Sequence, residues 1–347
     1  MVNIPAPVGG TALPADFAPS IVFAILYALI APFMIYRVLL KRRSRTLLLI
    51  GTVIFSIERV VVFSLRAAQS RSEEKRFSHG LLNYMQISFG LGFIGIANDL
   101  INIIKCLMIN PTYGSDMFYQ SPAANTKEGV FKRPPEGTPD RPKLRFWLRR
   151  WADLLNLAFF AASLPGSIFL GQYSKTFDDQ NKANSVQRFR SVSAGVALCL
   201  CILVIITAVL CRIKLHTPRR SISFMIFIAS LMSIVAIYRL SIMSIKTTSI
   251  TVQTSLDEPG QKALFYIFHA LPEWLAITSM VMANVRKWFG TGLAGDYLGR
   301  DWNEKQVKRY EAKQAKKDNV RSARDESSDA IPLKEKKSRL ITSEEQV

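Results

Sequence analysis

Long, almost uncharged apolar blocks constrain the fold of this chain more than any other feature. Each block holds about eighteen or more mostly apolar residues, enough for a helix to cross ~30 Å of hydrocarbon. The blocks lie at residues 17–40, 46–67, 80–109, 151–172, 192–211, 221–243 and 261–285. The sequence therefore predicts an all-α, polytopic membrane protein whose residues 17–290 form a seven-transmembrane-helix bundle.

The chain has a formal net charge of +19, which indicates either nucleic-acid binding or contact with anionic lipid. A nucleic-acid-binding protein needs a folded, water-exposed basic surface. Here the basic residues flank the apolar blocks instead, where anionic lipid of the inner leaflet attracts them. We therefore expect membrane lipids as partners and no nucleic acid.

The positions of Lys and Arg between the blocks predict the orientation of the bundle. No basic residue precedes Arg37, whereas Lys41, Arg42 and Arg43 follow the first block and further basic residues fill 110–150. Because cytoplasmic loops carry the excess of Lys and Arg, this pattern places the N-terminus outside and the C-terminus inside. We expect a multi-pass protein of the plasma membrane rather than of an internal membrane.

Three polar segments lie outside the predicted helices. Residues 1–16 are predicted to be a short extracellular tail, and 110–150 an irregular, partly disordered cytoplasmic loop rich in proline and basic residues. Residues 291–347 are predicted to be a basic, largely disordered cytoplasmic tail, in which 301–317 has the composition of a solvated helix. We expect cytoplasmic protein partners, if the chain has them, to bind this loop and this tail.

Five ionisable residues of the blocks are predicted to share one depth in the membrane. They are Glu58 and Arg59 in the second block, Arg239 in the sixth, and His269 and Glu273 in the seventh. At about 1.5 Å per residue along a helix, all five lie from the midplane outward. Such groups cost about 2.5–3.5 kcal/mol each on insertion scales, so they are expected to pair or to face a cavity.

Two interpretations of this layer remain open. The first is a ligand-binding pocket, open outward, that takes a small ligand or an amphipathic lipid. The second is a salt-bridge network that fixes helix packing, with Arg239 paired to Glu273 and Arg59 to Glu58 or its neighbours. Pro272 removes one backbone hydrogen bond, so a kink there either opens a cavity or belongs to the architecture.

A secondary polar cluster is predicted in the inner half of the third block. Asn102 lies four residues after Asn98 and three after Asp99, so the three side chains are neighbours on a helix. Hydrogen bonds between helices are the simplest role for such a group in a membrane.

The sequence gives little support to an enzyme. The three histidines, His79, His216 and His269, fall at different predicted depths, so they do not predict a metal site. The chain also has no Gly-rich phosphate-binding loop and no G-x-S-x-G nucleophile motif. We therefore expect no catalytic residues, no metal and no cofactor.

The segment FYIFHALPEWLAITSMVMANVRKWFGTG at 265–292 resembles the last span of a fungal family of seven-transmembrane integral membrane proteins of unknown function. The resemblance covers roughly residues 17–290. The matching elements are the Leu-Pro-Glu step Leu271, Pro272 and Glu273, the pair Tyr238 and Arg239, the second-span Arg59, and the Gly-rich SFGLGFIGIANDL at 88–100. It implies the same seven-span topology.

A second resemblance is to the fungal lipid-translocating exporter group, which shares this topology. That group is expected to carry extra acidic residues in its sixth and seventh spans. The sixth block here has no acidic residue, which departs from the pattern.

Three functions follow from these observations. We expect a non-enzymatic, receptor-like sensor that binds a small amphipathic ligand through Glu58, Arg59, Arg239, His269 and Glu273. The alternatives are a lipid or amphiphile exporter and a membrane scaffold without a ligand pocket. An exporter is usually built from internal repeats, and no convincing repeat is visible in the sequence.

Overall fold

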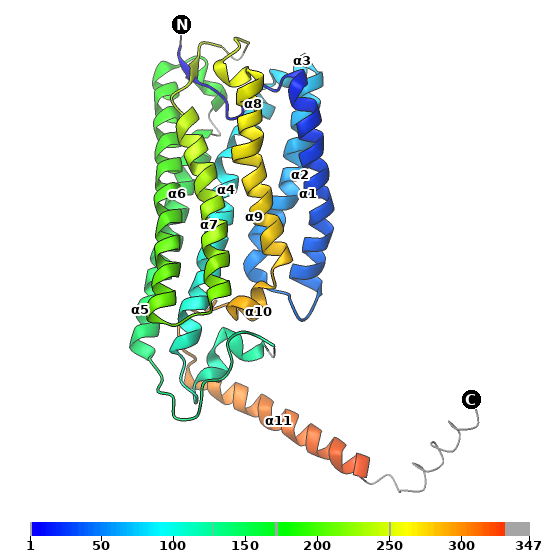
Figure 1. Cartoon of the computed structure of the whole chain (residues 1–347), viewed down its shortest axis with the longest axis vertical. Coiled ribbons are helices and arrows are strands. Elements are labelled where there is room, and N and C mark those ends of the chain that lie inside the picture. Colours follow the sequence, from blue (N-terminus) through cyan, green and yellow to red (C-terminus); the bar gives the residue numbers. More distant parts are fainter. Residues whose placement is uncertain (1, 127, 171–172, 250, 330–347) are drawn as a thin grey trace, which may run out of the picture. The chain divides into compact units, whose positions relative to one another are not determined.

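The computed structural model describes residues 2–126, 128–170, 173–249 and 251–329. The chain divides into two compact units, Met1–Gly299 and Arg300–Val347. The first unit is a bundle of long helices and the second contains one helix, α11 (Glu304–Asp329) (Figure 1).

Long helices form almost all of the first unit. They are α1 (Phe17–Ile35) with its π-helical continuation Tyr36–Leu40, α2 (Ile50–Arg71), α4 (His79–Ile109), α5 (Pro142–Leu170), α6 (Gln180–Lys214), α7 (Arg219–Ile242), and the continuous α8 (Pro259–Phe265), π-turn Tyr266–Ala270 and α9 (Leu271–Met282). Two short helices, α3 (Glu73–Arg76) and α10 (Val285–Phe289), lie at the ends of the bundle. The strands β1 (Ile4–Pro5) and β2 (Lys246–Thr247) pair antiparallel.

Loops gather at the two ends of the bundle, which we call the upper and lower ends after their places in Figure 1. The upper end consists of residues 2–16, 72–78, 173–179, 243–249 and 251–258. The lower end consists of residues 41–46, 110–126, 128–141, 215–218 and 283–299. Short 3₁₀ turns occur in both ends: Pro14–Asp16, Leu47–Leu49, Asn110–Thr112, Phe118–Gln120, Pro122–Asn125, Tyr173–Thr176 and Ser255–Asp257.

Six helical stretches are long and apolar enough to cross a membrane. They are Pro14–Leu40, Leu47–Arg71, His79–Thr112, Gln180–Lys214, Arg219–Ile242 and Pro259–Met282. The prediction of a polytopic, all-helical membrane protein is confirmed at this level. The predicted span 151–172 lies on α5, which is not among the six, and its last two residues fall outside the described ranges.

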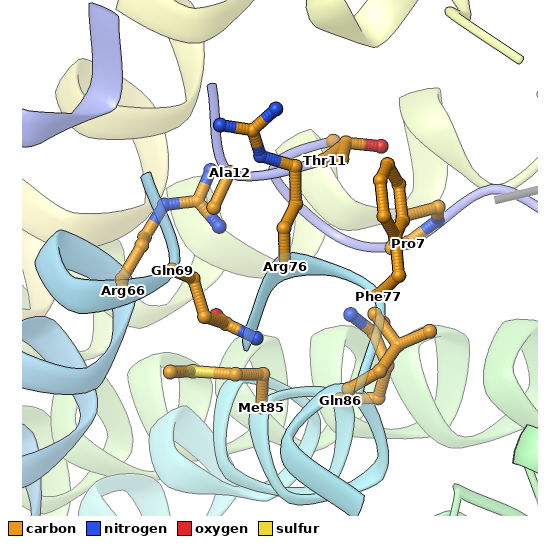
Figure 2. A pocket seen from close by; sticks show the side chains of 11 residues that line it. Pro7, Thr11, Ala12, Arg66, Gln69, Arg76, Phe77, Met85 and Gln86 are labelled. Atoms are coloured by element: carbon orange, nitrogen blue, oxygen red, sulfur yellow. The ribbon is translucent and has the colours of Figure 1, made fainter. Parts of the chain in front are cut away.

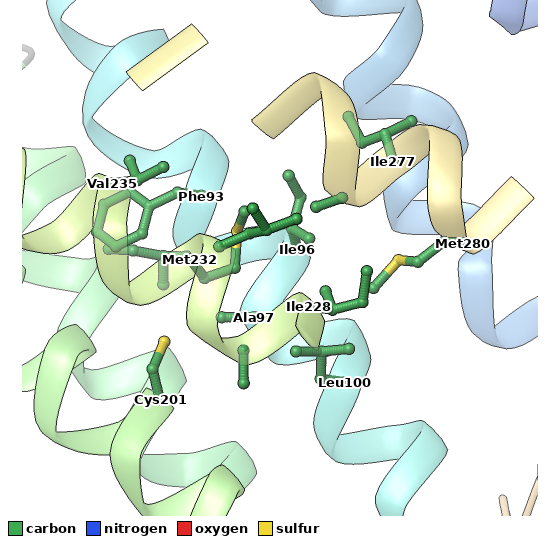
Figure 3. Close-up of a cluster of buried hydrophobic side chains, with 14 of the residues drawn as sticks. Phe93, Ile96, Ala97, Leu100, Cys201, Ile228, Met232, Val235, Ile277 and Met280 are labelled. Atoms are coloured by element: carbon green, nitrogen blue, oxygen red, sulfur yellow. The ribbon is translucent and has the colours of Figure 1, made fainter. Parts of the chain in front are cut away.

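Helix α4 lies at the centre of the bundle and packs against α2, α5, α6 and α7. Its apolar side chains interdigitate with those of α7 and α9, as Figure 3 shows for Phe93, Met232 and Ile277. All three are buried. The apolar residues of the other helices point outward as well as inward, and Leu29 and Ile54, for example, are 68% and 63% exposed. An outward apolar surface is what a helix needs when its surroundings are lipid.

A π-turn interrupts the last span directly before Pro272. The backbone N–H of Leu271 bonds to the carbonyl of Tyr266, five residues back. Pro272 has no N–H to donate and its ring crowds the preceding turn, which favours the wider turn at this place. The bulge lies at His269, so it decides how that imidazole enters the bundle.

Residues 110–126 and 128–141 form a loop that its own side chains hold together, whereas partial disorder was expected over 110–150. Asp140 accepts hydrogen bonds from both terminal nitrogens of Arg145 at 2.9 Å and from the Gly114 backbone N–H at 3.0 Å. Tyr113 and Phe118 pack together in a small apolar cluster of their own. The proline-rich composition suggested disorder, but the side chains of the loop satisfy its own backbone and order it.

Both terminal segments also differ from the predicted free tails. Residues 4–8 are buried at the upper end, as the next subsection describes. Residues 291–299 belong to the bundle, where the Leu293 carbonyl accepts a hydrogen bond from the Leu47 N–H at 2.7 Å. The tail beyond forms α11, because Glu, Lys, Gln and Ala favour a helix, and residues 330–347 lie outside the described ranges.

Candidate functional site

A buried ion pair joins α2 to α9 inside the bundle. Nε of Arg59 donates to Oε2 of Glu273 at 3.0 Å, and Nη2 lies 2.9 Å from the same oxygen and 3.2 Å from Oε1. Both residues are 0% exposed. Two nitrogens of one guanidinium therefore bind one carboxylate, the planar geometry that makes arginine pairs strong and directional.

The remaining nitrogen of Arg59 faces α4 and Glu58. Nη1 donates to the hydroxyl of Ser88 at 2.7 Å and lies 3.4 Å from Oε2 of Glu58. Ser88 in turn hydrogen-bonds to Glu58, as does the Tyr84 hydroxyl at 3.3 Å. The side chain of Glu58 remains 27% exposed. Arg59 therefore forms ion pairs with two acidic residues. Glu273 is enclosed, whereas Glu58 lies at the surface of the bundle.

Gly92 on α4 makes room for the Arg59 guanidinium. A Cβ atom at this position would lie 2.2 Å from Nη2 of Arg59 and 2.2 Å from the ring of Phe55. The Phe55 ring covers the guanidinium carbon at 4.2 Å, a favourable cation–π contact. The glycine-rich sequence of the third block therefore has a local steric role beside the ion pair.

His269 and Arg239 lie next to this pair with fewer partners. Nε2 of His269 is 3.9 Å from Oε1 of Glu273, and neither imidazole nitrogen has a hydrogen-bond partner among the described residues. Arg239 donates Nη1 to the Gly90 carbonyl, while its Nε has no partner. Arg239 and His269 are 1% and 0% exposed. Burying a polar atom without a hydrogen-bond partner costs free energy. These nitrogens are therefore candidates to bond to a ligand.

The structure brings together all five residues that the sequence placed in one layer. Of the expected pairs, Arg59 does lie beside Glu58, at 3.4 Å. Arg239 was expected to pair with Glu273, but Arg59 binds that carboxylate instead. No carboxylate of the described residues forms an ion pair with Arg239. No three His, Cys, Asp or Glu side chains of the described residues are grouped as ligands for a metal.

Arg190 on α6 is a further buried arginine that the sequence analysis missed. It is 2% exposed, donates Nη1 to the Ala6 carbonyl at 3.1 Å, and its Nε has no partner among the described residues. It lies within electrostatic range of Arg239. The predicted fifth block began at residue 192, two residues after it, so its charge was assigned to a loop.

The N-terminal segment closes the upper end of the bundle. Ile4, Ala6 and Val8 are at most 2% exposed, and the Val8 N–H donates to the side chain of Gln86 at 3.0 Å. Figure 2 shows this segment crossing over Gln86 and its neighbours on α4, beside side chains of α2. The cavity left there measures only about 20 Å³, room for about one water molecule.

A second charge network holds this segment in place. Asp16 lies 2.9 Å from Nη2 of Arg66 and 3.0 Å from Nζ of Lys262, and it is fully buried. The Tyr266 hydroxyl donates to Asp16 at 2.9 Å, and Asp257 accepts from the Thr11 N–H at 2.7 Å. The sequence analysis did not identify this network. The one indication of it was that Arg66, a charged residue, lies inside the predicted second block.

Tyr173 binds the same segment from a loop. Its hydroxyl donates to the Pro5 carbonyl at 2.5 Å, and complete burial raises the pKa of this phenol. The upper end is therefore closed by hydrogen bonds from several separate parts of the chain, among them α2, α4, α6 and the Tyr173 loop, and the layer below it is not open at that end.

The secondary polar cluster lies lower on α4. Asp99 accepts from the Thr52 N–H at 2.9 Å and from its hydroxyl at 2.5 Å, which joins α4 to α2. Asn102 accepts from Asn156 of α5 at 3.4 Å. Asn98 is half-buried and has no hydrogen bond to the described residues. Asp99 and Asn102 therefore bond to different helices, α2 and α5, and the three residues do not form one hydrogen-bonded group.

Asp99 and Asn102 also line a cleft of about 520 Å³ at the lower end, together with Lys105, Asp296 and Tyr297. Lys105 binds Asp153 at 2.9 Å, and Arg149 binds Asp296 at 2.7 Å. Lys105 also lies 3.9 Å from Asp296, so Arg149 and Lys105 together hold Asp296 beside the cleft.

Comparison with known proteins adds no relative: no protein-family model, no curated protein and no solved structure matches this chain. The resemblance to fungal seven-transmembrane proteins therefore stays a prediction from the sequence.

Proposed function

We propose that this chain is a non-enzymatic sensor that spans the membrane seven times and binds a small amphipathic ligand with an acidic head group. The ligand site is the layer of Glu58, Arg59, Arg239, His269 and Glu273. The N-terminus is outside and the C-terminus is in the cytoplasm of a cell whose plasma membrane holds the protein.

The seventh span of this proposal is α5. Its side chains Leu154, Leu157 and Phe160 are 55%, 62% and 59% exposed, like the outward residues of the six apolar stretches. Because α5 packs between α4 and α6, it would share their lipid surroundings. With α5 as a seventh span, the two ends of the first unit would lie on opposite sides of the membrane. The basic lower end would then face the cytoplasm.

The observation that carries the ligand proposal is that buried nitrogens of Arg239 and His269 have no hydrogen-bond partner among the described residues. A buried arginine with no carboxylate partner is costly, and Arg190 adds a second positive charge within electrostatic range. His269 adds two ring nitrogens that have no hydrogen-bond partner within the described part of the chain. A carboxylate or similar acidic group would satisfy the arginine and accept from the imidazole.

The bilayer is the proposed route of entry. The N-terminal segment closes the upper end, whereas the Glu58 side chain is 27% exposed beside α4. The half-buried Tyr84 lies at the same place and hydrogen-bonds to Glu58. A ligand with an apolar tail can approach this surface from lipid, which supports an amphipathic rather than a water-soluble ligand.

The test uses the purified full chain in nanodiscs with a fatty acid, myristate, and its uncharged counterpart, myristyl alcohol. We expect myristate to raise the melting temperature of the wild type more than the alcohol does. Arg239→Gln abolishes the difference, because the acidic head group loses its partner. Arg212→Gln, which removes one charge at the far end of α6, is the matched control. Equal responses of Arg239→Gln and the control would overturn the ligand site.

A scaffold without a pocket is the second candidate, and the Arg59–Glu273 pair favours it. Both side chains are enclosed and satisfy each other, as expected of a group that only fixes helix packing. Protease protection of tagged termini tests the topology, which both candidates share. Cleavage of an N-terminal tag from outside and of a C-terminal tag only after permeabilisation is expected, and both tags on one side would contradict seven spans.

A further inference from the structure

A basic cleft of about 450 Å³ opens at the lower end of the bundle, far along α1 and α9 from the buried charge layer. It lies between the end of the first span, the loop around residue 126, and the start of α10. Its lining residues are Arg37, Lys41, Arg42, Arg43, Ser44, Asn125, Thr126, Glu128, Asn284, Arg286 and Lys287.

The basic side chains of this cleft are poorly neutralised by the protein. Glu128 is the one acidic residue of its lining, and it lies 3.9 Å from Lys287, with 69% of its side chain exposed. Arg37 and Arg286 donate to backbone carbonyls, those of Met282 and Arg42, both at 2.8 Å. Burial and the neighbouring Arg45 lower the pKa of Arg286. Six cations thus face one another with little internal compensation.

Thr126 gives a second, independent indication of a ligand. Its hydroxyl oxygen is buried and has no hydrogen-bond partner among the described residues. Thr126 lines the cleft together with the six basic residues. A buried hydroxyl without a partner beside a group of cations fits a site in which a bound anion accepts hydrogen bonds from both.

The position of the cleft distinguishes between a soluble anion and a lipid. The first apolar stretch ends at Leu40 and the last at Met282, and these residues are 65% and 63% exposed. Lys41 and Asn284, which follow them directly or after one residue, line the cleft. The cleft therefore begins where the lipid-facing surface stops, at the depth of phospholipid head groups.

We propose that this cleft binds a phospholipid whose head group carries more than one phosphate, with its acyl chains along the exposed ends of α1 and α9. Six basic residues against one acid require several negative charges, more than a phosphodiester lipid supplies. Arginine and lysine bind phosphate oxygens well in this setting, and basic pockets beside spans bind such head groups. This site is independent of the ligand proposed for the Arg239 layer.

The experiment measures binding of three probes to the purified full chain in nanodiscs made of phosphatidylcholine, whose zwitterionic head group has no net charge. The probes are a short-chain phosphatidylinositol bisphosphate, free inositol trisphosphate and short-chain phosphatidylserine. The bisphosphate lipid should bind about tenfold or more tightly than either of the others, since it alone combines acyl chains with several charges.

Two variants test whether the cleft is the site. The double variant Arg42→Gln with Arg43→Gln removes two exposed cleft cations, and Lys214→Gln with Arg219→Gln removes two exposed cations elsewhere at the lower end. The cleft variant should weaken binding of the bisphosphate lipid by about tenfold, while the control changes it little. Thr126→Val keeps every charge and should weaken binding by a few fold, about the effect of one hydrogen bond.

Each other outcome contradicts the proposal. Equal losses in the cleft and control variants would show general attraction to the basic end without a site. Free inositol trisphosphate that binds as tightly as the lipid would show a site for a soluble phosphate compound. If phosphatidylserine bound as tightly as the bisphosphate lipid, the cleft would not require a head group with several phosphates.

Discussion

Arg59 of α2 and Glu273 of α9 form an ion pair with both residues fully enclosed and their closest atoms 2.9 Å apart. These residues are 214 positions apart in the chain, so the pair fixes how the second and last spans pack. It also affects the rest of the layer, because Glu58 then lies at the bundle surface and Arg239 has no carboxylate partner among the residues that the structure describes.

The first prediction concerns this pair. Glu273→Gln leaves the Arg59 charge enclosed with only Glu58 near it, and we expect a loss of about 3–5 kcal/mol in the free energy of unfolding. Arg59→Gln with Glu273→Gln removes both charges and should cost less than the sum of the single changes. Unfolding of the three variants in detergent measures this coupling. Additive losses would show that the two side chains do not interact.

Gly92→Ala is predicted to displace the Arg59 guanidinium. The new Cβ atom would lie 2.2 Å from Nη2, and the Phe55 ring blocks the other side. Overpacking of this kind costs about 3 kcal/mol and should lower the melting temperature strongly. Gly95→Ala on the same helix is the matched control, because nothing lies within 4 Å of its added carbon. If both variants melt alike, Gly92 has no steric role.

The closed upper end gives a third prediction. Asp16→Asn removes the carboxylate that Arg66 and Lys262 share, which leaves two buried cations with reduced compensation. We expect a loss of about 3 kcal/mol and faster hydrogen exchange in residues 4–13. Asp179→Asn is the control. Asp179 is partly exposed, its ion pair is with the neighbouring Lys182, and asparagine can keep its role as the cap of α6. Unchanged exchange in Asp16→Asn would contradict an anchored segment.

The loop at 110–141 is predicted to resist proteases in the wild type. Arg145→Gln removes the fork that binds Asp140 and the Thr112 carbonyl, worth about 1.5–3 kcal/mol per charged hydrogen bond. Cleavage between residues 113 and 140 should therefore become several times faster. Arg150→Gln, an exposed side chain one helical turn along, should leave the cleavage rate near that of the wild type. Rapid cleavage of the wild type would support the disorder that composition alone suggests.

The helices of the bundle were predictable because apolar blocks of this length have few alternatives. The predicted first span, 17–40, coincides with α1 and its π-helical end, whereas α6 begins at Gln180, twelve residues before the predicted 192. Asp179 caps that helix by accepting from the N–H groups of Asn181 and Lys182. Hydropathy identifies the apolar part of a helix. It does not identify polar turns by which the same helix continues beyond the apolar part.

The members of the charged layer were predictable from depth, and so was the contact between Arg59 and Glu58, but the partner of Glu273 was not. Depth along a helix says nothing about which face of the helix a residue occupies relative to a distant span, so Arg59 took the place expected for Arg239 beside Glu273. Arg190 and Asp16 were missed because both lie at the edges of blocks, where a charge is usually solvated. Their burial depends on the N-terminal segment, whose few apolar residues carry no periodic signal.

Arg239 carries the proposed ligand site because it is buried without a carboxylate partner among the described residues, and a cryo-electron microscopy map of the full chain in native lipid tests this directly. We predict density that belongs to no residue of the chain, within hydrogen-bonding distance of Arg239 and His269, with an extension towards Glu58 and the bilayer. A map in which Arg239 pairs with a carboxylate of the protein, and in which side chains fill the space around His269, would contradict the ligand site.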